Sequence, residues 1–146
     1  MYNIGQISKM FNIPISTLRY YDKEGLFPEL ERESGIRRFG EKETEALRII
    51  ECLKTSGLEI KDIRQFMMWC KEGSSTYQKR LDLFLNQKTR VEEELKELQK
   101  TLALIEFKCW YYKKAIADGN EEELRKMFPD NFPEEVQKLY NEAHGK

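Results

Sequence analysis

The sequence predicts a mainly α-helical protein in three parts: a small N-terminal domain of short helices, one long helix, and a short helical tail. Short apolar-periodic segments separated by Gly and Pro fill the first part, and a heptad repeat of apolar residues fills the second. The composition agrees, because 40% apolar, 35% charged and 12% aromatic residues are not typical of a disordered or membrane protein. A length of 146 residues suffices for one domain, or for a small domain plus an elongated element.

The first two elements should be short helices joined by a tight turn. A helix over Ile4–Phe11 has Asn3 as its N-cap and Gln6 in the position of a capping-box partner. A second helix should begin at residue 14 or 15 and end at Glu24, because Pro suits the first turn of a helix and Gly suits the position after its end. Two helices with this short connection fit the helix-turn-helix geometry. Their expected contacts join Leu18 and Tyr21 to Ile7, Met10 and Phe11.

Residues 26–39 should form a wing of two short extended pieces around a Ser34-Gly35 turn. A third helix is expected over Glu41–Lys54 and a fourth over Ile60–Lys71. Residues 71–75 are the most linker-like stretch. The inner faces of these two helices should consist of Ala46, Leu47, Ile50 and Leu53 in the third and Ile63, Phe66, Met67 and Cys70 in the fourth.

A heptad seam then extends over residues 77–116, interrupted only by Lys88. The helix would be about 60 Å long at 1.5 Å per residue, too long to bury its seam against the N-terminal domain. Each exposed Leu would forgo roughly 1.5–3 kcal/mol, so the sequence predicts a homodimer. The expected interface residues are Leu81, Phe84, Val91, Leu95, Leu98, Leu102, Ile105, Cys109 and Tyr112.

These patterns divide the chain into residues 1–72, a winged helix-turn-helix domain of the kind that can bind DNA; residues 73–118, a dimerisation helix; and residues 119–146, a short helical tail and candidate effector region. No apolar run is long enough to span a bilayer, and the N-terminus lacks the pattern of a signal peptide. The cysteines lie far apart, which is typical of reduced thiols. We therefore expect a cytoplasmic protein. Because 25 basic residues face 26 acidic ones, net charge neither favours nor excludes a polyanionic partner.

The segment IGQISKMFNIPISTLRYYDKEGLFP, followed by RESGIRRF and a helix that ends at SGLEIKDIRQF, resembles the MerR family of transcriptional regulators over residues 2–70. The resemblance implies a homodimer joined by an antiparallel coiled coil. Such a dimer would bind a palindrome within a promoter, then bend and untwist the overlong spacer so that RNA polymerase engages both promoter elements. The implied partners are double-stranded promoter DNA, a second copy of the chain and, through the DNA, RNA polymerase.

The resemblance also assigns DNA contacts. The second helix would enter the major groove, and the wing would reach the backbone. Ile36 and Phe39 stand where many family members have Tyr, which removes two possible hydrogen bonds to phosphate. Leu18 and Tyr21 should belong to the core. The expected DNA-binding residues are Ser16, Thr17, Arg19, Tyr20, Arg37 and Arg38.

The sequence supports two hypotheses about the effector. No cysteine follows Cys109 and the single histidine is His144, so we expect neither a metal site nor a cofactor. ESGIRRF and IIECLKTSGL resemble the branch of the family that responds to aldehydes and other thiol-reactive electrophiles, with Cys52 as the candidate thiol and Arg48 or Lys54 as cations that favour its thiolate. The alternative is that Cys52 is an ordinary buried cysteine, and burial is also expected for Cys70.

A second effector hypothesis is a pocket for a small apolar ligand, lined by aromatic residues of the long helix and the tail. Packing of the tail on the long helix is the preferred interpretation of the same residues. They are Phe107, Trp110, Tyr111, Tyr112, Phe128, Phe132 and Tyr140.

Other function classes fit less well. The sequence shows no Ser-His-Asp or Cys-His set, no glycine-rich phosphate loop and no paired metal ligands, so we do not expect an enzyme. A coiled-coil adaptor that does not bind DNA would explain residues 77–116 but not the helix-turn-helix and the wing.

Overall fold

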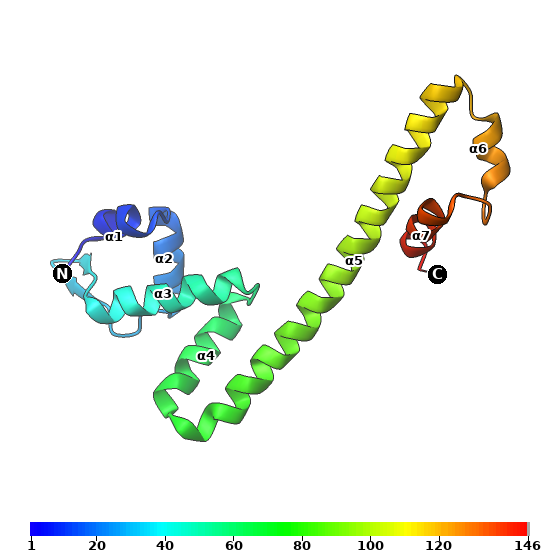
Figure 1. Ribbon diagram of the computed structural model, residues 1–146. Helices are drawn as coiled ribbons and strands as arrows, with labels where there is room; N and C mark the ends of the chain where they lie inside the picture. Colours follow the sequence, from blue (N-terminus) through cyan, green and yellow to red (C-terminus); the bar gives the residue numbers. More distant parts are fainter. Residues whose placement is uncertain (146) are drawn as a thin grey trace. The chain divides into compact units, whose positions relative to one another are not determined.

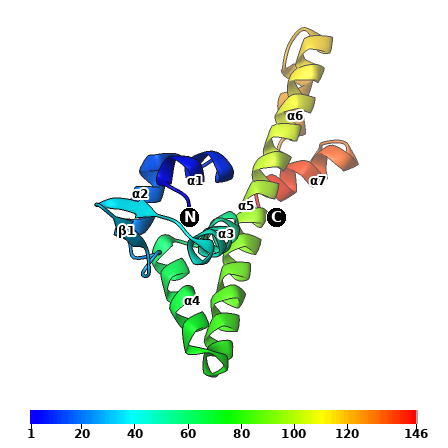
Figure 2. The same ribbon diagram turned by 90° about the vertical axis from the view of Figure 1, so that its left-hand side faces the viewer.

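The structure is a computed structural model that describes residues 1–145, and it separates into two compact units. The N-terminal unit comprises Met1–Gln87, and the C-terminal unit begins at Lys88. The predicted fold class is confirmed, because helices dominate both units and the strands form one small hairpin (Figures 1 and 2). None of the helices in residues 1–145 has the length and apolar character that crossing a membrane requires.

In the N-terminal unit, the elements occur in the predicted order, and the ends of α1 to α4 differ from expectation by no more than one residue. They are α1 (Ile4–Phe11), α2 (Ile15–Lys23), β1 (Glu31–Glu33), β2 (Ile36–Arg38), α3 (Glu41–Thr55), α4 (Ile60–Glu72), the 3-10 turn η1 (Ser74–Thr76) and the start of α5 (Tyr77–Asp118).

Helix α1 begins at the predicted capping box. The side-chain oxygen of Asn3 accepts a hydrogen bond from the backbone N–H of Gln6 at 2.8 Å, and the Gln6 side chain accepts one from the backbone N–H of Asn3 at 2.8 Å. The helix ends at Asn12, whose φ of 54° lies in the left-handed region that Asn tolerates. Local side-chain chemistry therefore sets both ends of this helix.

The core of the N-terminal unit joins all four of its short helices. Ile7, Leu18, Leu47, Ile50 and Ile63 are each 0% exposed. Two expectations about this core are wrong. Met10 is exposed because the buried face of α1 is centred on Ile4, Ile7 and Phe11, and Cys70 is exposed because α4 packs through Ile63, Phe66 and Met67.

The wing is an antiparallel hairpin in which Arg32 pairs with Arg37. Ser34 and Gly35 make its turn with φ values of 52° and 79°, the combination of a type I′ turn. Phe39 follows β2, forms a backbone bridge with Tyr2, and is buried edge-on against Phe27 at 5.6 Å between ring centroids. These contacts anchor the base of the hairpin to the core.

Helix α5 contains 42 residues. In the C-terminal unit its later turns pack against α6 (Glu122–Met127) and α7 (Glu134–Ala143), which lie beside it (Figure 1). Phe107 lies at the centre of this second core and is 1% exposed. The tail therefore forms two short helices that fold onto α5.

Candidate nucleic-acid interface

Helix α2 presents one face to solvent and one to the core. Ser16 and Arg19 are exposed, Thr17 is half-buried, and Tyr20 is 48% exposed. The first turn of α2 carries no acidic residue, which suits an anion near the positive end of the helix dipole. The residues predicted to contact DNA on this helix therefore lie together at its accessible N-terminal part and along its outer side.

Tyr21 anchors the inner face of α2 to α3. Its hydroxyl donates to Glu51 Oε1 at 2.9 Å and accepts from Lys54 Nζ at 2.6 Å. Burial is the main cause that raises the pKa of Tyr21, and the hydrogen bond from Lys54 acts in the opposite direction. The same hydrogen bond raises the pKa of Lys54. Leu18 and Tyr21 are thus core residues, as expected, and α2 is held in one orientation on α3.

The wing arginines are paired within the chain. Arg37 Nε donates to Asp22 Oδ2 at 2.8 Å, and Arg32 Nη2 donates to the same oxygen at 2.9 Å. Arg38 Nε donates to Glu33 Oε2 at 3.0 Å. Figure 2 shows the hairpin next to α2, so Arg37 joins the wing to that helix whereas Arg38 is paired within the hairpin.

Asp22 and Arg32 belong to this site and were not among the predicted site residues. The sequence signal for Arg32 is its place opposite Arg37 once the hairpin is centred on Ser34-Gly35. Asp22 carries no such signal, because it meets the wing only through the fold of the unit. The structure thus brings Arg37 to α2 through a carboxylate that sequence reasoning missed.

All three cysteines are exposed. The expectation that Cys52 is an ordinary buried cysteine is therefore wrong, because α3 packs through Leu47, Ile50 and Leu53. Lys54, one of the two cations expected to favour a Cys52 thiolate, donates instead to Tyr21.

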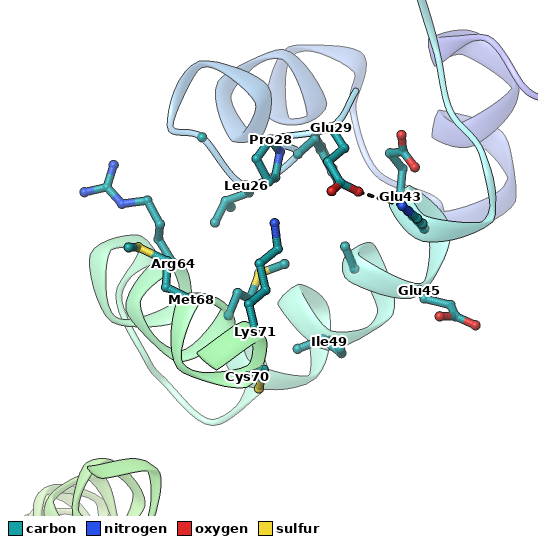
Figure 3. Close-up of a pocket in the computed structure, with 15 residues that line it drawn as sticks. Leu26, Pro28, Glu29, Glu43, Glu45, Ile49, Arg64, Met68, Cys70 and Lys71 are labelled. Atoms are coloured by element: carbon teal, nitrogen blue, oxygen red, sulfur yellow. Dashed lines mark hydrogen bonds and ion pairs between the residues drawn. The ribbon is translucent and has the colours of Figure 1, made fainter. Parts of the chain in front are cut away.

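A groove of about 700 Å³ lies between α3, α4 and the segment that follows α2 (Figure 3). Leu26, Pro28 and Met68 are among the apolar residues that line it, and Lys71 reaches from α4 toward the segment after α2. Cys70 also belongs to its lining. Of the two thiols in the N-terminal unit, Cys70 therefore lines this groove and Cys52 does not.

The aromatic residues of the C-terminal unit pack on one another. Phe107 contacts Phe132 and Tyr140 with ring centroids 5.1 Å and 5.3 Å apart, and Phe128 contacts Phe132 at 4.9 Å. Tyr111 is buried, and a hydrogen bond to the Glu121 carboxylate raises the pKa of its hydroxyl. These contacts support the interpretation that the aromatic residues pack the tail onto α5.

The predicted seam of α5 is uncovered along the described chain. Leu98 is 65% exposed and Ile116 is 81% exposed, values unusual for large apolar side chains at regular spacing. Phe84, another exposed member, also packs edge-on against Phe66 of α4. The remaining exposed apolar members of the seam are Tyr77, Leu81, Val91, Leu95, Leu102, Ile105, Cys109 and Tyr112. Within residues 1–145, no group of three His, Cys, Asp or Glu side chains is arranged to hold a metal ion.

Comparison with known proteins identifies relatives that match most of the chain. The family model described as MerR HTH family regulatory protein matches residues 2–68. An uncharacterised HTH-type transcriptional regulator of Haemophilus influenzae is 40% identical over 120 residues, which are 82% of this chain and 89% of that protein. The HTH-type transcriptional regulator AdhR of Bacillus subtilis is 33% identical over 92 residues, 62% of this chain and 66% of that protein.

A solved structure shows the same fold. It is the crystal structure of HiNmlR, a MerR family regulator lacking the sensor domain, bound to promoter DNA. The two chains are 39% identical, and they superpose with a TM-score of 0.62 over 82% of this chain and 95% of that one. The winged unit and the long helix are therefore shared with a protein that was crystallised on DNA.

Proposed function

This chain belongs to the MerR family of helix-turn-helix regulatory proteins, and on that premise we propose how it acts as a DNA-binding transcriptional regulator. Regulators of this family bind promoter DNA as dimers. The observation that carries the proposal is the two-sided helix α2: Tyr21 is locked onto α3, while Arg19 and Tyr20 on the same helix face solvent. We place α2 in the major groove with the wing on the adjacent backbone.

The division of labour follows the three parts of the chain. Residues 1–72 read the DNA, residues 73–118 dimerise, and the packed tail formed by residues 119–145 stabilises the end of the dimerisation helix. The uncovered apolar seam supports dimerisation, because a second copy of α5 would remove it from water. Two recognition helices held at a fixed separation would read a palindrome. Bending and untwisting of the promoter spacer would follow where the added contacts outweigh the deformation energy of the DNA.

Footprinting tests this proposal directly. The purified protein is added to the DNA upstream of its own coding region, and DNase I cleavage is compared with that of a shuffled duplex of equal length. We expect a protected region with two-fold symmetry, with enhanced cleavage at its centre where the DNA bends. In vitro transcription on the same fragment reports activation or repression. Equal affinity for the operator and the shuffled duplex would contradict sequence-specific regulation.

We propose that Cys52 makes this regulator responsive to electrophiles. The supporting observation is that Cys52 is exposed on α3 directly after Glu51, whose carboxylate holds the Tyr21 hydroxyl of α2. A thiolate that adds to a quinone or an unsaturated aldehyde forms a C–S bond as the conjugated C=C π bond breaks, and the resulting enolate takes up the proton that the thiol has released. Because Cys52 is exposed, the adduct would act on the adjacent Glu51 and its bond from the Tyr21 hydroxyl, and allosteric coupling is typically of order 1–3 kcal/mol.

Single serine variants separate the thiols. Cys52→Ser should bind the operator normally and lose the transcriptional response to an added quinone, whereas Cys70→Ser and Cys109→Ser should respond like the parent. Mass spectrometry locates the adduct. A full response from Cys52→Ser, or an adduct found only on Cys70 beside the groove, would exclude Cys52 as the sensor.

A further inference from the structure

One carboxylate oxygen of Asp22 holds two arginines of the wing. Asp22 Oδ2 accepts from Arg37 Nε at 2.8 Å and from Arg32 Nη2 at 2.9 Å. The Asp22 side chain is 14% exposed, and Arg37 is less exposed than Arg32, with values of 24% and 51%. This clamp of Asp22, Arg32 and Arg37 therefore joins both strands of the wing to the helix that carries the predicted base-contacting residues.

The clamp offsets charge repulsion between two arginines of the hairpin. Arg32 and Arg37 are direct cross-strand partners, and like charges in that position destabilise an antiparallel pair. The hairpin has three residues in each strand, and an isolated two-stranded ribbon of this kind has little stability of its own. A shared anion between the two guanidinium groups removes their repulsion and, because the anion belongs to α2, fixes the direction of the wing relative to that helix.

We propose that Asp22 is a positioning residue for DNA recognition, which sets the wing and α2 in the relative register that fits the operator. This inference rests on the proposed DNA-binding function. A guanidinium has five N–H donors, and the bond from Arg37 to Asp22 uses the one at Nε, so the same side chain has further donors with which to hold a phosphate. Asp22 itself repels DNA, so its benefit must come through the arginines that it orients.

Because Asp22 both orients the wing arginines and repels DNA, its loss should change the affinities for operator and for unrelated DNA in opposite directions. In Asp22→Asn the anion is lost, so the wing is no longer held in one register and Arg32 and Arg37 become available to any phosphate. We expect affinity for the operator to fall about tenfold, as for the loss of a charged hydrogen bond. Affinity for an unrelated duplex should rise about twofold, with a salt slope steeper by up to about 0.9.

The measurement is a titration of operator and unrelated duplex at several salt concentrations, by fluorescence anisotropy. Glu33→Gln is the matched control, because it removes the same charge from the wing next to Arg38 but leaves the clamp intact. Its ratio of operator to unrelated affinity should remain within about twofold of the parent. Asp22→Glu keeps the charge and should recover most of that ratio. If Asp22→Asn does not fold, the double variant Asp22→Asn, Arg32→Gln also removes the cross-strand repulsion and is measured instead, with the same loss of operator affinity expected.

Each other outcome overturns the inference. Equal weakening on both duplexes with an unchanged salt slope would make Asp22 a purely structural residue, and equal tightening would make it only a repulsive charge. An unchanged ratio for Asp22→Asn would show that the clamp does not position the wing. If the parent itself does not prefer the operator, the proposed function fails, and this is seen before any variant is measured.

Discussion

Replacing Leu98 by Asp should convert the dimer into a monomer and abolish operator binding. Leu98 lies on the seam of α5 and is 65% exposed, so it contributes little to packing within its own chain. Full burial of a Leu side chain is worth roughly 1.5–3 kcal/mol, and burying the exposed part of this one is worth about 1–2 kcal/mol. The residue occurs once in each chain, so a symmetric dimer loses about 2–4 kcal/mol, or roughly 30- to 1,000-fold in dissociation constant.

The introduced carboxylate adds to this loss, because a charge in the seam is desolvated without a partner of opposite sign. Leu102→Asp, one seam position further along, should behave in the same way because Leu102 is 55% exposed. Glu93→Lys is a matched control: Glu93 lies midway between the seam residues Val91 and Leu95, on the outer side of the helix. It also changes a charge on α5 and should leave the dimer intact.

Sedimentation velocity at micromolar concentrations measures the association, and gel shift on the operator measures its consequence. The parent and Glu93→Lys should sediment as dimers, and Leu98→Asp and Leu102→Asp as monomers that do not shift the operator. The reasoning is refuted if the parent is a stable monomer at these concentrations, or if Leu98→Asp associates as tightly as the parent. A monomeric variant that binds the operator with parental affinity would show that dimerisation is not needed for recognition.

Replacing Arg37 by Ala should weaken binding to the operator more than binding to unrelated DNA, because it also breaks the clamp with Asp22. Replacing Arg19 by Ala should weaken both alike and reduce the salt slope by about 0.9 for the phosphate that is no longer neutralised. An unchanged slope would assign that arginine a structural role. Because burial raises the pKa of Tyr21, the folded chain holds the phenolic proton more tightly than the unfolded chain, so the free energy of unfolding should fall as pH rises above about 10. Urea titrations should show a smaller fall for Tyr21→Phe, and an identical fall would disprove the linkage. Gly57→Ala should lower stability by about 1 kcal/mol or more, because φ is +85° and the added Cβ would lie 2.8 Å from Gln87 Nε2. A thermal unfolding midpoint equal to that of the parent would contradict this.

Features that depend on neighbouring residues could be predicted from the sequence. The capping box of α1 requires only Asn3 and Gln6, and the wing turn requires only Ser34-Gly35, so local sequence was enough to predict both. The seam of α5 was predictable because its spacing repeats over many turns. Periodicity did not predict the exposure of Cys52. In a helix of the length of α3, residues at the edge of the inner face are buried or exposed according to which helix packs beside them.

Contacts between distant residues could not be predicted. Gln87 Nε2 donates to the carbonyl of Ser56 at 2.7 Å. Arg37 of β2 forms an ion pair with Asp22 of α2. Each pair depends on how several elements pack, and neither residue of a pair carries a local signal for its partner. The predicted DNA-binding residues on α2 were easier to find than Asp22, because a resemblance in motif identifies positions on one helix but not the ion pairs that orient them.

The ion pairs of the wing also explain why net charge was uninformative. The chain has 25 basic and 26 acidic residues, yet the question for DNA binding is which cations are available at the interface. Arg37 is paired with Asp22 and Arg38 with Glu33, so a phosphate that approaches the wing must share or replace an existing carboxylate partner. The loss of the existing ion pair offsets part of the free energy gained from the phosphate contact. Arg19 lies on the exposed side of α2, and its contact with a phosphate would be new. It follows that Arg19 should account for a larger share of the non-specific affinity than either wing arginine, and that the wing contributes chiefly to specificity.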